Sequence, residues 1–129
     1  MATRTPPFHL ILASEAARDI LEILDWSAAR FGERAASRYL ALMEQALLDL
    51  SADPERRGAR HRVELREQAW TYHLRYSRDR VRNSRKVAFP RHFLLYRLRE
   101  DRVVEVARVL HDASDLDRHL PEDYDAEFT

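Results

Sequence analysis

The stretch that decides the fold is KVAFPRHFLLYRLREDRVVEVARVLHD, residues 86–112. Within it, residues 93–96 and 103–110 are rich in β-branched and aromatic side chains, which favour strands. The charged residues 99–102 between them suit a hairpin turn. The stretch therefore predicts two antiparallel strands that are neighbours in a sheet.

The second of these strands alternates along its length. Strict alternation places Val104, Val106 and Arg108 on one face of the sheet. The opposite face then carries Val103, Glu105, Ala107 and Val109. A guanidinium stays charged and is costly to bury alone. Arg108 is therefore predicted either to pair with a carboxylate or to lie at an edge of the sheet.

The first half of the chain predicts one strand and a helical hairpin. Residues 8–12 form a short apolar run, long enough for a strand, and Ser14 after it suits the N-cap of a helix. Apolar residues then recur every three and four positions on both sides of Gly32, as in two amphipathic helices joined by a tight turn. The second helix is expected to end at the Asp-Pro pair of residues 53–54.

The region between the helices and the hairpin is harder to interpret. Residues 70–76 alternate like a strand, which completes an α+β fold: a strand, a helical hairpin, then a three-stranded antiparallel sheet. Residues 77–91 are longer than an ordinary hairpin loop, and residues 87–89 are a rival candidate for a strand. The length fits a single domain over residues 1–129, with an acidic tail from about residue 112.

The composition excludes several classes of protein. The chain has no cysteine, hence no disulfides and no thiolate metal sites. It has no signal-like leader and no apolar run of about 18 residues, so we expect a cytoplasmic protein with no contact with the membrane. The net charge of zero conceals a strong segregation: residues 54–99 hold 14 Lys or Arg against 4 Asp or Glu, and residues 100–129 hold 3 against 10. The basic middle indicates a surface that recognises anions or an acidic partner, unless its arginines are merely solvated.

Three segments together resemble a known family. Residues 90–97 hold a tyrosine in a strand, residues 104–111 hold a strand that ends in Val-Leu-His, and residues 115–120 hold an aspartate and a His-Leu pair. This order and spacing resemble the carboxy-terminal half of ParE-type toxins of bacterial type II toxin-antitoxin systems, within the RelE/ParE superfamily. The strand and helical hairpin predicted upstream agree with the order of elements in that family.

The resemblance implies a toxin that inhibits DNA gyrase and is neutralised by a cognate antitoxin. The expected partners are that antitoxin, gyrase, and the DNA that gyrase holds; no cofactor is implied. RelE-type relatives instead act as ribosome-dependent endonucleases of messenger RNA, and fold alone does not separate the two. A third alternative is a non-toxic module that binds an antitoxin or DNA.

The candidate site residues are basic. Those expected to bind the target are Arg75, Arg82, Arg85, Arg91, Arg108 and His111. Arg75, Arg108 and His111 are also weak candidates for catalysis, because an RNA endonuclease needs groups that stabilise phosphate charge and transfer protons.

Structural roles are expected for the other polar residues of these strands. Tyr96 is predicted to be a core or rim residue, Arg97 to point to the opposite face, and His73 and His92 to be surface or sheet residues. No metal is expected, because no zinc spacing pattern is matched by His111, Asp112, Asp115 and His119.

Overall fold

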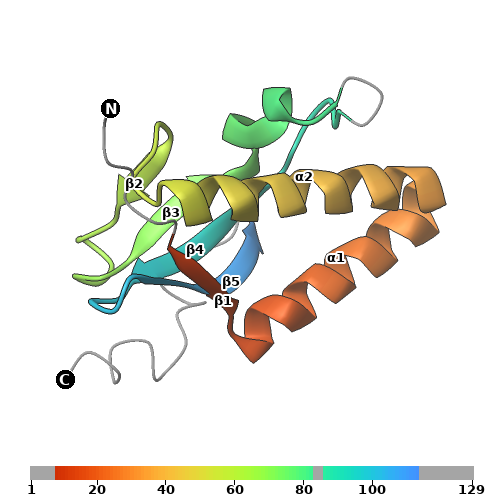
Figure 1. The fold of residues 1–129 in the computed structure, drawn as a ribbon. Coiled ribbons are helices and arrows are strands. Elements are labelled where there is room, and N and C mark those ends of the chain that lie inside the picture. Colours follow the sequence, from red (N-terminus) through yellow and green to blue (C-terminus); the bar gives the residue numbers. More distant parts are fainter. Residues whose placement is uncertain (1–7, 83–85, 114–129) are drawn as a thin grey trace.

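The computed structural model describes residues 8–82 and 86–113, and in it a helical hairpin packs on one face of a five-stranded sheet (Figure 1). The elements are β1 (His9–Leu12), α1 (Ser14–Phe31), α2 (Glu33–Ala52), β2 (Ala59–His61), β3 (Trp70–His73), the 3-10 helix η1 (Leu74–Arg80), β4 (His92–Leu98) and β5 (Val103–His111). The predicted α+β class and the order of its elements are confirmed. None of the described helices is long and apolar enough to cross a membrane.

The sheet is mixed and has the order β1-β5-β4-β3-β2. Its centre, β3-β4-β5, is the predicted three-stranded antiparallel sheet. The N-terminal strand β1 joins one edge parallel to β5, and the short strand β2 joins the other edge antiparallel to β3. The two edge strands therefore widen the predicted sheet without changing its class.

The helix boundaries follow local chemistry. The chain leaves the sheet only after Ala13, whose N–H donates to the carbonyl of Val106 at 2.9 Å. Ser14 is therefore already helical and its side chain caps nothing, so the N-cap prediction was wrong. Gly32, with a φ of 95°, separates the two helices as predicted, because glycine adopts positive φ at little cost. Helix α2 ends at Ala52, before the Asp-Pro pair.

The main core lies between the helical hairpin and the sheet. Fully buried side chains of α2 contact strand residues that point to the helices, and each such large side chain contributes roughly 1.5 to 3 kcal/mol to stability. The largest members of this core are Leu42, Met43, Leu50, Tyr72, Leu74, Leu94, Tyr96, Val104 and Val106.

Strict alternation fails in β5 because the strand contains a bulge. Tyr96 pairs with Val106, but Leu95 pairs with Arg108, so Ala107 is an extra residue. Ala107 packs with Leu95 in a small cluster separate from the main core. Beyond the bulge the phase is reversed, and Val109 joins Val104 and Val106 in the main core. The predicted face for Val109 was therefore wrong.

The predicted strand of residues 70–76 is shorter than expected. It ends at His73, and the chain turns into η1, which takes up the first part of the long insertion. Buried Asp49 of α2 holds this turn: Ser77 Oγ donates to it at 2.6 Å and Arg80 Nε at 2.7 Å. Residues 87–89, the rival strand, are not in a strand.

Candidate functional site

Three histidines meet at one end of the sheet. His73 ends β3, His92 begins β4 and His111 ends β5. The register pairs His92 with His111, and their ring centres are 5.4 Å apart. His73 is paired with Phe93, the neighbour of His92. We call these three residues the histidine cluster.

Asp112, directly after β5, joins this cluster to an arginine. Its carboxylate lies 3.2 Å from His73 Nε2, 3.2 Å from Arg91 Nη2 and 3.5 Å from His111 Nδ1. Burial alone would raise the pKa of Asp112, but the hydrogen bond from His73 and the charge of Arg91 outweigh it and lower the pKa. The carboxylate is therefore ionised and holds its basic neighbours in place.

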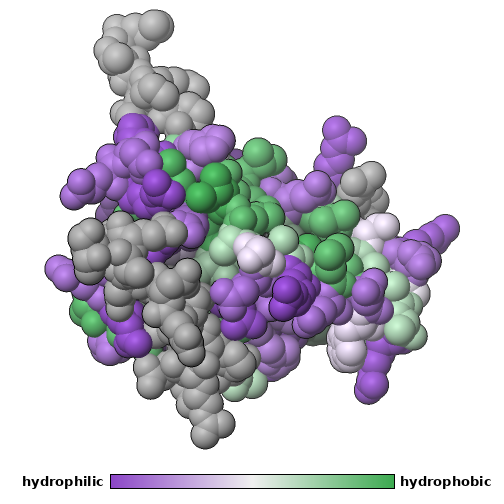
Figure 2. Space-filling view, turned by 90° about the horizontal axis from the view of Figure 1, so that it is seen from below, coloured by the Kyte–Doolittle hydropathy of each residue, from purple (hydrophilic) through white to green (hydrophobic). Residues whose placement is uncertain are grey.

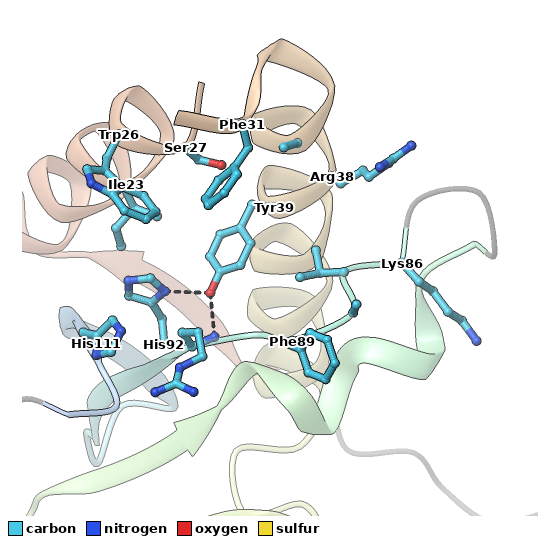
Figure 3. Close-up of a pocket in the computed structure, with 14 residues that line it drawn as sticks. Ile23, Trp26, Ser27, Phe31, Arg38, Tyr39, Lys86, Phe89, His92 and His111 are labelled. Atoms are coloured by element: carbon cyan, nitrogen blue, oxygen red, sulfur yellow. Dashed lines mark hydrogen bonds between the residues drawn. The ribbon is translucent and has the colours of Figure 1, made fainter. Parts of the chain in front are cut away.

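Tyr39 of α2 connects the cluster to the helices. Its hydroxyl lies 2.6 Å from His92 Nδ1 and accepts the N–H of Arg91 at 3.0 Å (Figure 3). Burial raises the pKa of Tyr39 to about 12 and, with the charge of His111, lowers the pKa of His92 to about 4. At neutral pH the phenol is protonated and donates to Nδ1, which leaves neutral His92 with its proton on Nε2.

A groove of about 450 Å³ opens beside Tyr39 and the histidines. It lies between the end of α1, the start of α2 and residues 86–91, and we call it the apolar groove (Figure 3). Trp26, Phe31 and Phe89 line it and are respectively 56%, 65% and 83% exposed. The underside of the molecule likewise shows apolar surface bordered by hydrophilic residues (Figure 2). Arg38 and Lys86 also line the apolar groove, which gives it cationic as well as apolar walls.

A second groove, of about 370 Å³, lies on the sheet face that points away from the helices. Alternation turns Thr71, His73 and Phe93 to this face, since their neighbours Tyr72 and Leu94 belong to the main core. It is lined by the carboxylate of Asp112 and by the basic and aromatic side chains of Arg60, Arg62, His73, Arg75, Tyr76 and Phe93, and we call it the arginine groove.

Arg108 is partly buried and held by a carboxylate. Its guanidinium donates two hydrogen bonds to Asp19 of α1, at 2.8 and 3.0 Å, so the predicted carboxylate partner is confirmed. Asp19 also accepts the N–H of Val109 at 2.9 Å, where β5 extends beyond the end of β1. This pairing gives Arg108 a structural task, and it lies apart from the histidine cluster.

The other predicted residues divide into two groups. Arg75 and Arg91 line one common pocket with His73 and Asp112, and His111 contacts Asp112, so these three predicted residues lie together. Arg82 is exposed, beyond the end of η1. Arg85, Asp115, His119 and the acidic tail after residue 113 lie outside the described residues.

The structural roles expected for Tyr96 and Arg97 are confirmed. Tyr96 is fully buried and donates to the carbonyl of Pro54. Arg97 is 3% exposed and pairs with Glu105 at 2.7 Å. Within the described ranges, no three side chains of the metal-binding types are grouped so as to hold an ion.

The sequence did not identify Tyr39 or the meeting of the histidines. His73 and His92 were expected only as surface or sheet residues, and as strand residues they are. Their closeness to His111 depends on register. Counted outward from the turn, His92 would face Leu110, and only the bulge at Ala107 moves His111 opposite to it.

The fold and the two grooves define a class: an α+β protein whose mixed sheet carries a helical hairpin on one face and a basic surface on the other. A family model described as the ParE toxin of the type II toxin-antitoxin system parDE matches residues 10–116. The chain belongs to this toxin family.

Solved structures include chains similar to this one. A chain of the RelBE2 toxin-antitoxin complex from Mycobacterium tuberculosis is 20% identical and has a TM-score of 0.48. The likeness covers 81% of this chain and 98% of that one. Among curated proteins, none matches this sequence.

Proposed function

We propose that the chain is a toxin that inhibits DNA gyrase in the bacterial cytoplasm and that a cognate antitoxin neutralises it. The observation that carries the proposal is the match to the ParE toxin family over residues 10–116. The geometry adds support, because Arg75, Arg91 and His111 are exposed at one end of the sheet, where they are accessible to a large partner. In this proposal these residues bind gyrase or the DNA that it holds.

The apolar groove is the proposed docking site of the antitoxin. Its exposed aromatic side chains need an apolar partner, and Arg38, Lys86 and Arg91 among its lining residues favour acidic side chains beside that apolar surface. An amphipathic helix with one apolar face and acidic flanks meets both demands. The antitoxin is therefore expected to fold such a segment into the groove.

A gyrase supercoiling and cleavage assay tests the toxin proposal. The purified chain should block supercoiling and accumulate linear DNA that is covalently linked to gyrase. Arg75→Ala and Arg91→Ala should each raise the inhibitory concentration about tenfold, as expected for the loss of a hydrogen bond to a charged group. The matched controls are Arg18→Ala and Arg34→Ala, which remove exposed arginines from the helices and should inhibit as well as the wild type.

The outcome that contradicts the proposal is intact supercoiling at a large molar excess of folded chain. A chain that is also harmless when expressed without its antitoxin would instead be a non-toxic binding module.

One observation favours a messenger RNA endonuclease as a second candidate. His73, Arg75 and Tyr76 line one groove and supply an imidazole, a guanidinium and a phenol side by side. If the chain cleaves messenger RNA in a translating extract, His73→Gln should abolish cleavage. The control His9→Gln, on exposed β1, should not.

A further inference from the structure

Several described arginines are neutralised by a carboxylate, but two that line the arginine groove are not. Arg56 and Arg80 pair with Asp49, Arg97 with Glu105 and Arg108 with Asp19. In the arginine groove, Arg62 pairs with Glu64 at 2.6 Å, but Arg60 and Arg75 have no carboxylate partner among the described residues. Both are exposed, and exposed Arg57 lies close enough to act on the same groove. Asp112 also lines the groove, but its carboxylate contacts His73 and Arg91, so the charges of Arg60 and Arg75 have no described acidic partner and the groove stays basic.

An aromatic ring is fixed beside these charges. Tyr76 packs directly on Gly58: a Cβ there would lie 2.4 Å from the ring, and the φ of +96° also requires glycine. The Arg75 guanidinium lies 5.0 Å from the centre of the ring and donates to the hydroxyl at 3.1 Å. The hydrogen bond from Arg75, and then the charges of Arg75, Arg60 and Arg57, lower the pKa of Tyr76, consistent with a positive field at the groove.

We propose that the arginine groove binds the phosphodiester backbone of a single-stranded nucleic acid, with Arg60 and Arg75 on phosphates and Tyr76 against a base. The planar fork of a guanidinium matches phosphate oxygens, and an aromatic face beside it offers a base a surface on which to stack. An acidic peptide would pair with the guanidinium groups of Arg60 and Arg75 but would not need the aromatic ring of Tyr76.

The size and place of the groove favour a single strand over a duplex. A space of about 370 Å³ on the sheet is too small to admit a double helix, whereas a single strand presents one backbone and bases free to stack. This inference rests on the proposed function for its biological meaning: a chain that inhibits gyrase would meet the DNA that gyrase holds. The binding itself requires only the chain and a bare oligonucleotide.

Fluorescence anisotropy with labelled 12-nucleotide oligothymidylate and oligouridylate tests this inference. Both probes share the phosphodiester backbone, so both should bind, and a preference for one would identify DNA or RNA as the natural source. Affinity should fall as salt rises, because each neutralised phosphate releases counterions. The double variant Arg60→Gln with Arg75→Gln should weaken binding at least tenfold and reduce the slope of log K against log salt by about 1.4, from about 0.7 for each phosphate contact.

Two comparisons distinguish binding in the arginine groove from non-specific attraction of the oligonucleotide to positive surface charge. The control Arg18→Gln with Arg34→Gln removes the same charge from the helical face and should leave the affinity within about twofold. Tyr76→Leu should weaken binding about tenfold while Tyr76→Phe binds like the wild type, since stacking needs the ring and not the hydroxyl. Circular dichroism and thermal unfolding establish that each variant is folded.

Three results would overturn the inference. They are no binding of either oligonucleotide at low salt, an equal loss of affinity in the groove and control variants, and tighter binding of polyglutamate than of oligothymidylate. The last would make the groove a surface for acidic proteins. Binding of the strand without inhibition of gyrase would overturn only the gyrase proposal, and inhibition of gyrase without such binding would overturn only this one.

Discussion

At the scale of single residues, His92 makes stability depend on pH. Its pKa is about 4 in the folded chain, below the ordinary histidine pKa of 6.5, because burial and the neighbouring His111 disfavour the imidazolium. The folded state therefore binds fewer protons than the unfolded state between these two values. Neutral His92 therefore contributes fully to the free energy of unfolding above about pH 6.5. This contribution, about 1 to 2 kcal/mol after allowance for solvent screening, is lost as the pH falls towards 4.

Urea unfolding at pH 7.5, 5.5 and 4.5 measures this loss. His92→Asn keeps an acceptor for the Tyr39 hydroxyl but does not titrate, so its stability should fall less steeply with acid than that of the wild type. The pKa of His73 is also lowered, mainly by burial, so His73 likewise makes stability fall with acid, and it does so equally in the wild type and in the variant. The difference between the two proteins therefore isolates His92, and identical pH profiles would contradict its assigned pKa.

At the scale of elements, Asp19 secures α1 to the free edge of β5. It accepts two hydrogen bonds from Arg108 and one from the Val109 N–H, and is 9% exposed. Asp19→Ala leaves both donors without this acceptor and should cost about 3 kcal/mol of unfolding free energy. In a double-mutant cycle with Arg108→Leu, the coupling should exceed about 1 kcal/mol.

The exposed pair Arg99–Asp101 supplies the control cycle. Its guanidinium and carboxylate remain in contact with water, so a coupling of about 0.5 kcal/mol is expected. Equal couplings in the two cycles would show that Asp19 is no more than a surface partner.

The elements themselves were predictable, and their exact register was not. The apolar periodicity around Gly32 and the composition of residues 93–110 are local signals, and they gave the helical hairpin and the β4–β5 pair. The bulge at Ala107 has no such local signal, because it depends on packing against Leu95 and on the Arg108–Asp19 pair across the sheet edge.

The candidate site was predictable only in part for the same reason. Arg75 and Arg91 stand out in the sequence because they belong to the basic segment, and His111 because it ends a predicted strand. The ionised Asp112 and the neutral His92–Tyr39 pair that organise them come from three different elements and required coordinates. Arg108 stood out equally, yet its carboxylate partner is 89 residues away in the chain.

At the scale of the whole molecule, the two helices and residues 86–91 form most of the apolar groove, and β2, β3 and η1 form most of the arginine groove. The two grooves approach each other at β4 and the end of β5, where His92 and His111 line the first and Phe93 and Asp112 the second. Arg91 and His111, proposed to bind gyrase, also line the apolar groove.

If the apolar groove receives the antitoxin, changes to its aromatic side chains alone should weaken antitoxin binding and leave the inhibition of gyrase intact. Trp26→Ser with Phe31→Ser removes two exposed rings that contact each other at 5.6 Å between centres. We expect antitoxin affinity to fall more than a hundredfold, as for central aromatic contacts of an interface, with inhibition of gyrase retained.

The matched control is Leu21→Ser with Leu48→Ser, which removes two equally exposed apolar side chains, 64% and 65% accessible, outside the groove. Titration calorimetry against the proposed cognate antitoxin measures both double variants, and both should unfold near the wild-type temperature because the replaced side chains contribute little to the core. If the groove variant kept wild-type affinity, the antitoxin would have to cover another face. Loss of antitoxin binding together with loss of gyrase inhibition, in a folded variant, would mean that one surface serves both partners and that neutralisation is direct competition for it.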